Sequence, residues 1–140
     1  MDADAARARF ALSRVARLAT ASADARPHLV PIVFALAGDV LYTAVDGKPK
    51  TTTALRRLAN MAANPQVAVL VDHYEDDWTR LWWARADGTV RILALDVAEA
   101  VAALGLLTER YPGYATQRPP GPVIAVDVTR WSGWVAAPER

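Results

Sequence analysis

Short apolar runs separated by turn-forming residues make up most of the chain, a pattern typical of strands joined by tight turns. These runs are rich in β-branched and aromatic residues and fall at 15–22, 28–37, 40–45, 66–74, 79–93 and 123–134. The run at 79–93 contains the hairpin dipeptide Asp87-Gly88, so we expect two strands that turn there. Pro31 cannot donate to a strand ladder and predicts an edge position or a bulge for the run at 28–37. The run at 66–74 has a continuous apolar centre, which predicts burial on both faces.

Three segments have helical character. Residues 2–13 are rich in Ala and Arg, with Asp2 or Asp4 as a possible N-cap, and predict a short surface helix. At 51–63 the apolar spacing i, i+3, i+4, i+7 predicts a buried stripe of Leu55, Leu58, Ala59 and Ala62. That register leaves another face open to solvent or ligand, with Arg56, Arg57 and Asn60 on it. At 97–110 the expected inner face consists of Val97, Val101 and Leu104, with Leu107 or Ala100.

These elements predict a mainly β fold with added helices. Strands that follow one another through tight turns form an antiparallel sheet, and such a sheet avoids exposed edges by closing into a barrel. A chain of 140 residues with 53% hydrophobic residues is long enough for one compact domain and too short for two ordinary ones. We therefore expect a single domain over residues 1–140, a small antiparallel β-barrel of six to seven strands with two or three peripheral helices.

The composition limits which partners and which chemistry the protein can have. The formal net charge is +1, so no global field would recruit nucleic acid or an anionic membrane. The absence of cysteine excludes disulfides, thiolate catalysis and Cys-ligated metal centres. No apolar run approaches the roughly 20 residues that span a bilayer, and the N-terminal residues lack the layout of a signal peptide. These features predict a cytoplasmic protein.

One segment could bind an anion locally. Residues 46–57, DGKPKTTTALRR, lead from the strand at 40–45 through a Gly/Pro turn into a helix. The start of a helix carries unpaired N–H groups and the positive end of the helix dipole. Lys48 and Lys50 precede Thr51, Thr52 and Thr53 at this start, which suggests a phosphate-binding site. A solvated turn with a threonine cap is the alternative that the segment alone leaves open.

Other chemistry finds little support. His28 and His73 are the only histidines, and neither belongs to a metal-ligand spacing, so we expect no metal site. Ser13, Ser22 and Ser132 lie in no nucleophile-elbow context. No GxGxxG or Walker pattern occurs, which argues against Rossmann and P-loop nucleotide binding. No catalytic residue can be named from the sequence.

The five tryptophans suggest a second copy of the chain. Trp82 and Trp83 are adjacent, so on a strand they point to opposite faces, one inward and one outward. Trp131 and Trp134 add further aromatic area near the C-terminus. An outward tryptophan on a small protein is commonly covered by another subunit. We therefore predict a homodimer.

Together these motifs resemble those of a known superfamily. The stretches RPHLVPIVFAL, YTAVDGKPK, NPQVAVLVDHY and LWWARADGTVRIL are similar, in order and spacing, to the pyridoxamine 5'-phosphate oxidase-like, flavin-binding split β-barrel superfamily, over roughly residues 15–134. The combination of KPK, LRRLANMAANP, LVDHYEDDW and LWWARADG resembles an actinobacterial branch of F420-dependent enzymes.

The resemblance implies an intertwined homodimer with two cofactor sites at the subunit interface. It implies that backbone groups of 28–33 line the cofactor ring, that Tyr42 and Thr43 lie close by, and that Lys48 and Lys50 hold the phosphate. The implied cofactor-binding residues are His28, Leu29, Val30, Pro31, Ile32, Val33, Tyr42, Thr43, Lys48, Lys50, Thr51, Thr52, Arg56, Arg57 and Trp83. Two departures argue against true pyridoxamine phosphate oxidase activity. Trp83 stands where those oxidases have a flavin-bonding glutamine, and an indole can donate but not accept. Their C-terminal Arg/His signature is replaced by DVTRWSGW.

F420 and FMN differ in the anion that the protein must hold. F420 carries a phosphodiester and an oligoglutamate tail, which suits an extended basic track. Four cations fall within ten residues, Lys48, Lys50, Arg56 and Arg57, and arginine suits carboxylates. The favoured hypothesis is therefore an F420-dependent oxidoreductase that transfers a hydride between the cofactor and a small organic substrate. An FMN-dependent enzyme of the same fold and a non-catalytic cofactor-binding protein are the alternatives. Tyr42, His28 or water would supply a proton.

Overall fold

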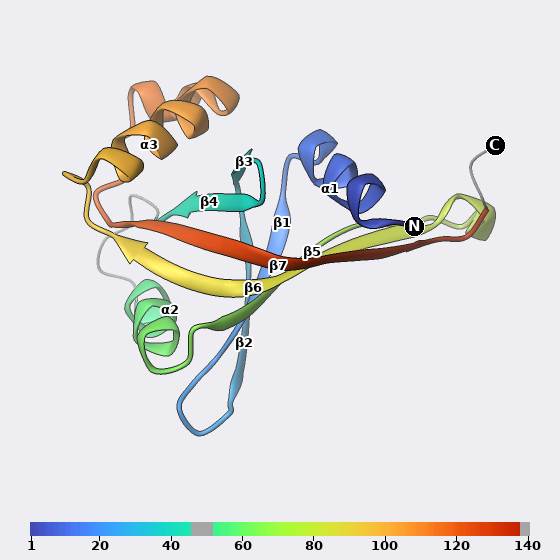
Figure 1. Cartoon of the computed structure of the whole chain (residues 1–140), viewed down its shortest axis with the longest axis horizontal. Helices are drawn as coiled ribbons and strands as arrows, with labels where there is room; N and C mark the ends of the chain where they lie inside the picture. Colours follow the sequence, from blue (N-terminus) through green and yellow to red (C-terminus); the bar gives the residue numbers. More distant parts are fainter. Residues whose placement is uncertain (46–51, 138–140) are drawn as a thin grey trace.

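The computed structural model describes residues 1–45 and 52–137, which form seven strands and three α-helices (Figure 1). The strands are β1 (Ala16–Ala21), β2 (Pro27–Ile32), β3 (Ala35–Ala37), β4 (Val40–Ala44), β5 (Gln66–His73), β6 (Trp82–Leu93) and β7 (Val123–Val135). The α-helices are α1 (Ala3–Leu12), α2 (Thr52–Ala63) and α3 (Ala98–Arg110), and the 3-10 turns are η1 (Trp78–Arg80) and η2 (Pro112–Ala115). None of the helices in these ranges is both long and apolar enough to cross a bilayer.

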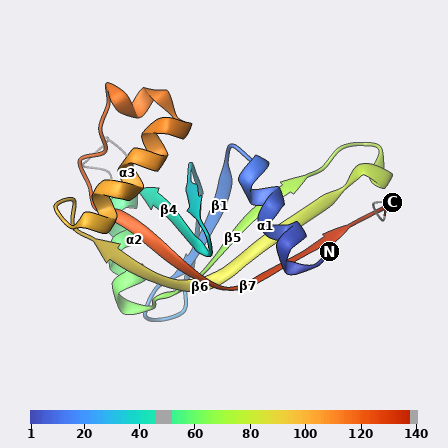
Figure 2. The ribbon, with the colours of Figure 1, turned by 45° about the horizontal axis from the view of Figure 1, so that its top comes forward.

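All strand pairs are antiparallel, and the sheet has the order β2-β1-β5-β6-β7-β4-β3. The two end strands of this order, β2 and β3, are consecutive in the chain and are joined only by Val33 and Phe34. The sheet must therefore curl until its two edges meet, which gives the predicted antiparallel split β-barrel. We call the Val33–Phe34 connection the seam. Figure 2 shows the long β6 and β7 running together through the molecule, with α2 and α3 at one end.

The expectation of one continuous strand over 28–37 is wrong, because the run is interrupted at the seam. Residues up to Ile32 pair with β1, whereas Ala35–Ala37 pair with β4 at the other side of the barrel. The chain has to leave one ladder before it joins the other. Pro31 does lie in an edge strand, as predicted from its missing N–H.

The predicted hairpin at Asp87-Gly88 is wrong, because β6 continues through it. The register against β7 shifts between Asp87 and Gly88, because Thr129 of β7 has no partner in the ladder there and forms a β-bulge opposite the dipeptide. A Cβ atom at Gly88 would lie 2.3 Å from the carbonyl oxygen of Asp127, so only glycine lets the strands approach here. The hairpin that joins β5 to β6 instead turns through η1, where the Asp77 side chain accepts from the backbone N–H of Thr79.

The core lies between α1 and the curled sheet. Phe10 of α1 is fully buried and contacts Phe34 and Trp131 edge to face, with ring centroids 5.8 and 5.2 Å apart. Trp131 is therefore a core contact and does not add to the exposed aromatic area as we predicted. Val67, Val69 and Val71 of β5 are buried while the residues between them are half-buried, so β5 has one inner face rather than two.

The helix registers also differ from the predictions. In the described part of α2 the buried residues are Arg57, Asn60 and Met61, whereas Ala59 and Ala62 are exposed. In α3 the buried residues are Ala100, Ala103 and Leu107, whereas Val97 and Val101 are exposed. Apolar spacing identified both helices. It was right for the inner face of α3 at Leu104, Leu107 and Ala100, and wrong at Val97 and Val101 there and at Ala59 and Ala62 in α2. In α3 small alanines let the helix lie close to β4 and β7.

Candidate functional site

A cavity of about 270 Å³ opens beside the seam. Its walls come from β2, β4, α2 and η2 and from two connections, and the lining residues are Val15, Pro31, Ile32, Val33, Thr43, Ala44, Arg57 and Tyr114. Pro31, Ile32, Val33, Thr43 and Arg57 belong to the set that the sequence predicts for cofactor binding. We call this hollow the seam cavity.

Two polar side chains of the seam cavity are buried in the fold. The Thr43 hydroxyl donates to the carbonyl oxygen of Val33 at 2.7 Å, which ties β4 to the seam. Thr43 itself is almost fully buried. Arg57 is 9% exposed, so its guanidinium sets a positive charge into a wall that is otherwise largely apolar.

The remaining predicted residues lie elsewhere. His28, Leu29 and Val30 are further along β2 and do not line the seam cavity, and Leu29 is 67% exposed on the outside of the sheet. Trp83 lies on β6, where the Arg85 guanidinium is 5.7 Å from its ring. Arg56 is exposed on α2.

The predicted phosphate-binding residues Lys48, Lys50 and Thr51 lie outside the described residues. Thr52 begins α2, and the described side chains of that helix start after 55. The phosphate-binding role therefore stays a prediction. Both ends of the segment 46–51 nevertheless connect to elements that line the seam cavity, β4 and α2.

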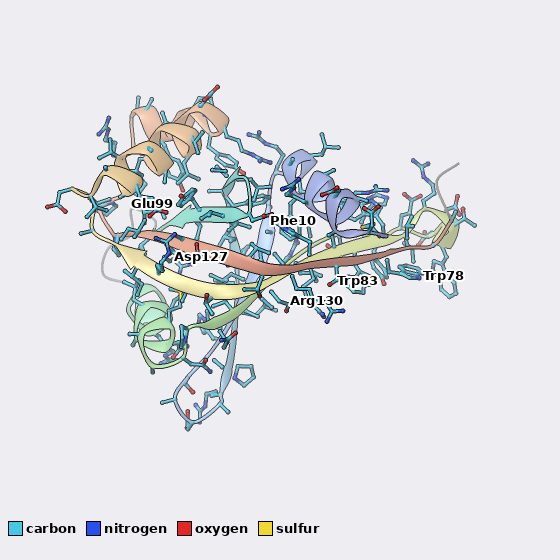
Figure 3. All side chains as sticks on the ribbon, viewed as in Figure 1. Phe10, Trp78, Trp83, Glu99, Asp127 and Arg130 are labelled. Atoms are coloured by element: carbon cyan, nitrogen blue, oxygen red, sulfur yellow. The ribbon has the colours of Figure 1, made fainter. Side chains whose placement is uncertain are left out.

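Tyr42 does not line the seam cavity but belongs to an ionic cluster under α3. Its hydroxyl donates to Glu99 at 2.7 Å, and Arg91 pairs with both Glu99 and Asp127 at 2.7 Å. Figure 3 labels Glu99 and Asp127 of this cluster. Burial, followed by the Glu99 hydrogen bond, raises the pKa of Tyr42 to about 12. The hydrogen bonds from Arg91 and then Tyr42 lower the pKa of Glu99 to about 2. A phenol held as a donor in this way is a poor proton source for chemistry in the seam cavity.

Sequence reasoning missed three of the lining residues, Val15, Ala44 and Tyr114. Tyr114 lies in η2, within the proline-rich stretch that follows α3. Its ring contacts that of Tyr111 edge to face, with centroids 6.4 Å apart. Two aromatics three residues apart in a Pro-Gly turn are the signal that could have drawn attention to this segment.

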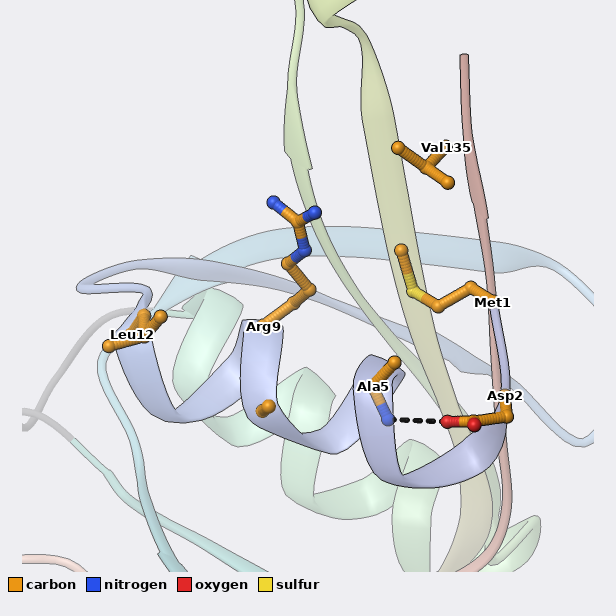
Figure 4. A pocket seen from close by; sticks show the side chains of 7 residues that line it. Met1, Asp2, Ala5, Arg9, Leu12 and Val135 are labelled. Carbon is orange, nitrogen blue, oxygen red and sulfur yellow. Dashed lines mark hydrogen bonds between the residues drawn. The ribbon is translucent and has the colours of Figure 1, made fainter. Parts of the chain in front are cut away.

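Larger hollows exist elsewhere, and in one of them the polar groups serve the fold. One of about 580 Å³ lies along α1 (Figure 4), where Asp2 caps the helix by accepting from the Ala5 N–H at 2.8 Å. The Arg9 guanidinium in that hollow is 4.7 Å from the ring of Trp82. Another of about 660 Å³ runs beside α3. Within the described ranges no group of three or more His, Asp or Glu side chains is arranged to hold a metal ion.

An antiparallel barrel split at a seam, with a cavity beside it, defines a split β-barrel protein. The family model "Pyridoxamine 5'-phosphate oxidase" matches residues 3–135, and the chain belongs to this family. The family assignment confirms the superfamily resemblance seen in the sequence. No curated protein matches the chain.

Solved structures with the same fold have low sequence identity to the chain. A FAD-binding protein from Mesorhizobium loti is 23% identical, with a TM-score of 0.71 over 95% of this chain and 94% of that one. The FAD binding protein from Mycobacterium smegmatis is 16% identical, with a TM-score of 0.65 over 96% and 94%. HutZ, the heme storage protein from Vibrio cholerae, is also 16% identical, with a TM-score of 0.70 over 96% and 95%. At these identities the similarity establishes the fold.

Proposed function

We propose that the chain binds a flavin-type cofactor at the seam cavity and is an oxidoreductase, with F420 as the cofactor. The observation that carries the proposal is the composition of the cavity wall. It combines flat apolar surface from Ile32 and Val33, the edge strand β2, and the buried cation Arg57. An edge strand offers unpaired N–H and C=O groups, which suit the polar edge of an isoalloxazine or deazaflavin ring.

The cofactor, when bound, supplies the hydride chemistry, and the protein supplies binding, orientation and electrostatics. Ile32 and Val33 would support the ring, and Thr43 would keep the seam in place through its bond to Val33. Arg57 would stabilise negative charge on the ring side of the cofactor. This differs from our sequence-based expectation, in which Arg57 shares an exposed face with Arg56. Arg56 alone of the pair is then available to the F420 tail.

The family and its relatives support a flavin-type cofactor more than heme. Two relatives with this fold are named FAD-binding proteins, and one is named a heme storage protein. Heme iron is commonly held by His, Met or Cys, and in catalase by Tyr. Among the described residues that line the seam cavity there is no His, Met or Cys and one tyrosine, Tyr114, whereas the apolar walls and the cation suit a flavin.

We also propose that the protein works as a homodimer. The seam cavity of one chain, about 270 Å³, lies just below the ~300–1,000 Å³ of ordinary small-molecule sites. A second copy would complete it. The outside of the sheet carries exposed Leu29 beside the cations Arg17 and Arg85 and the anion Asp72, around a groove of about 480 Å³. A patch with apolar area and both signs of charge can pair with itself across a twofold axis. In the ladder Arg17 is opposite Pro31 of the seam cavity, so the two regions adjoin.

Titration with F420 and FMN, followed by fluorescence and calorimetry, tests the proposal. We expect F420 to bind more tightly than FMN. Tight FMN binding without F420 binding would show that F420 is the wrong cofactor, and no binding of either would refute the flavin-type assignment. The variant Lys48→Ala/Lys50→Ala should weaken both ligands at least tenfold, because each lost charge-assisted hydrogen bond contributes about 1.5–3 kcal/mol.

Two further variants separate phosphate from tail binding. Arg56→Ala should weaken F420 several-fold and leave FMN unchanged, because FMN has no carboxylate tail. Arg26→Ala removes an exposed cation from the β1–β2 turn and serves as the matched control. Equal binding by the double lysine variant would rule out the phosphate-binding segment. F420 binding without reduction of a panel of enones and quinones would favour the non-catalytic alternative.

A further inference from the structure

The hydroxyl of Tyr111, the residue that caps the end of α3, hydrogen-bonds the backbone of the seam. The Phe34 backbone N–H donates to the Tyr111 hydroxyl at 3.3 Å. The same hydroxyl lies 3.0 Å from the Phe34 carbonyl oxygen and 2.9 Å from that of Arg14, and its single proton donates to one of them at a time. At the seam Phe34 has left the β2 ladder and has not yet joined that of β3, so its backbone lacks a strand partner. Tyr111 supplies the partner that a neighbouring strand would otherwise provide.

Each residue that Tyr111 bonds is a neighbour of a cavity wall. Phe34 follows Val33, and Arg14 precedes Val15, and both Val33 and Val15 line the seam cavity. The third wall, Tyr114, belongs to the same turn as Tyr111, whose carbonyl accepts from the Tyr114 N–H at 3.0 Å. The hydroxyl thus joins three of the cavity walls through one atom.

Contacts of two arginines, Arg14 and Arg110, also hold the segment around Tyr111 in place. We call the contacts of Tyr111 with Phe34 and Arg14 the junction. The Arg14 guanidinium is 4.7 Å from the Tyr111 ring and donates to the carbonyl of Arg110 at 2.8 Å. Arg110 in turn donates to the carbonyl of Ser13. These contacts hold the ring of Tyr111 in place without the hydroxyl. A variant that keeps the ring should therefore keep the fold.

We propose that Tyr111 is a positioning residue for the ligand of the seam cavity, because its hydroxyl sets the distance between Tyr114 and Val33 across that cavity. The inference rests on the proposed function in that the ligand is a flavin-type cofactor. Tyr114 is then the aromatic wall that contacts the ring, and Tyr111 acts through it.

The test compares Tyr111→Phe with wild type, and Tyr74→Phe is the matched control because Tyr74 is an exposed tyrosine in the β5–β6 loop. We expect Tyr111→Phe to raise the Kd of FMN or F420 about tenfold, and Tyr74→Phe to leave it unchanged. At saturating ligand, the emission of the bound cofactor should also change, since the Tyr114 ring is no longer fixed beside it. A simple loss of stability lowers the folded fraction and leaves the emission of the bound state as it was.

Two outcomes would overturn the inference. One is a Tyr111→Phe variant with wild-type affinity and wild-type bound emission. The other comes from Tyr114→Leu, which keeps the Tyr111 hydroxyl and is the second variant should Tyr111→Phe fail to fold. Wild-type affinity in Tyr114→Leu would mean that this wall does not touch the ligand.

If the wild-type protein binds neither cofactor, the proposed function is wrong. That result differs from a failure of the positioning role of Tyr111, in which the wild-type protein does bind a cofactor. Amide exchange of the ligand-free protein then tests the junction, with faster exchange at Phe34 expected in Tyr111→Phe and unchanged exchange overturning it.

Discussion

Arg91 binds two carboxylates, and this makes stability depend on pH. Its guanidinium donates to Glu99 at 2.7 and 2.9 Å and to Asp127 at the same two distances. The pKa of Glu99 falls from 4.5 to about 2 in the folded chain. A carboxyl with a lowered folded-state pKa stabilises the fold above its unfolded-state pKa, and this contribution is lost as pH falls. We therefore expect stability to decline between about pH 4.5 and 2.

The variant Glu99→Gln tests this contribution, because the amide keeps the shape of the side chain but not its charge. In thermal melts it should be less stable than wild type at pH 7, and the difference should shrink as pH falls toward 2. Glu109→Gln changes an exposed carboxylate of the same helix and should follow the wild-type curve. A constant difference between Glu99→Gln and wild type at every pH would contradict the assignment.

The sequence predicted some of the site residues correctly, but it did not predict whether they are buried. Thr43 and Arg57 were identified as site residues from the sequence, and both line the seam cavity. The burial of Arg57 and Asn60 was not predicted, because apolar spacing assigns polar residues to the outside of a helix by default. Arg57 is an exception because α2 borders the seam cavity and Arg57 lines it. Tyr111 and Tyr114 could not be connected with the seam, which lies about 80 residues earlier in the chain, without knowledge of the fold.

At Gly88 the strands β6 and β7 approach too closely to leave room for a side chain. A Cβ there would lie 2.3 Å from the Asp127 carbonyl oxygen and 3.1 Å from the Val126 Cγ1. Gly88→Ala should therefore destabilise the protein by about 2 kcal/mol, the middle of the range for overpacking. Urea unfolding measures the effect. Gly105→Ala is the control, since nothing lies within 4 Å of a Cβ at that exposed helical glycine, and it should stabilise by up to about 1 kcal/mol. Equal unfolding midpoints for Gly88→Ala and wild type would show that β7 can move away at no cost.

At the scale of elements, most strands and helices follow from local pattern, and the errors follow from pairing. Asp87-Gly88 suits a hairpin turn locally, but β5 and β7 both pair with β6 across it and keep the strand continuous. In the run at 28–37 Pro31 predicts an edge or a bulge, but no local signal shows that the chain passes from one ladder to the other after Ile32. Exchange of partners is a property of the whole sheet.

At the scale of the molecule, the barrel class could be predicted and the position of its seam could not. Closure follows from antiparallel strands that need their edges covered. The place where the two edges meet depends on the strand order, which puts consecutive β2 and β3 at opposite ends of the sheet. The seam cavity results from that order, since Pro31 to Val33 come from one edge and Thr43 and Ala44 from the other side.

The outer face of the sheet is the surface through which we propose that the dimer forms. Leu29, Leu70 and Trp83 lie on the outside of the sheet together with Trp134, which is paired with Trp83 in the ladder. Trp78 at the far tip of the β5–β6 arm is 77% exposed (Figure 3). Leu29→Arg places a cation in the middle of apolar area that a second copy would cover, beside Arg17 and Arg85. Sedimentation should therefore give the mass of one chain for Leu29→Arg and twice that mass for wild type.

Leu12→Arg is the matched control, because Leu12 is an exposed leucine on α1, away from this face. It should remain dimeric. Since a second copy would complete the seam cavity, Leu29→Arg should also lose cofactor affinity, although Leu29 does not line that cavity. A monomeric Leu29→Arg that binds cofactor like wild type would mean that one chain forms the whole site. A dimeric Leu29→Arg would move the interface to another surface, and the exposed arm with Trp78 would be the next to test.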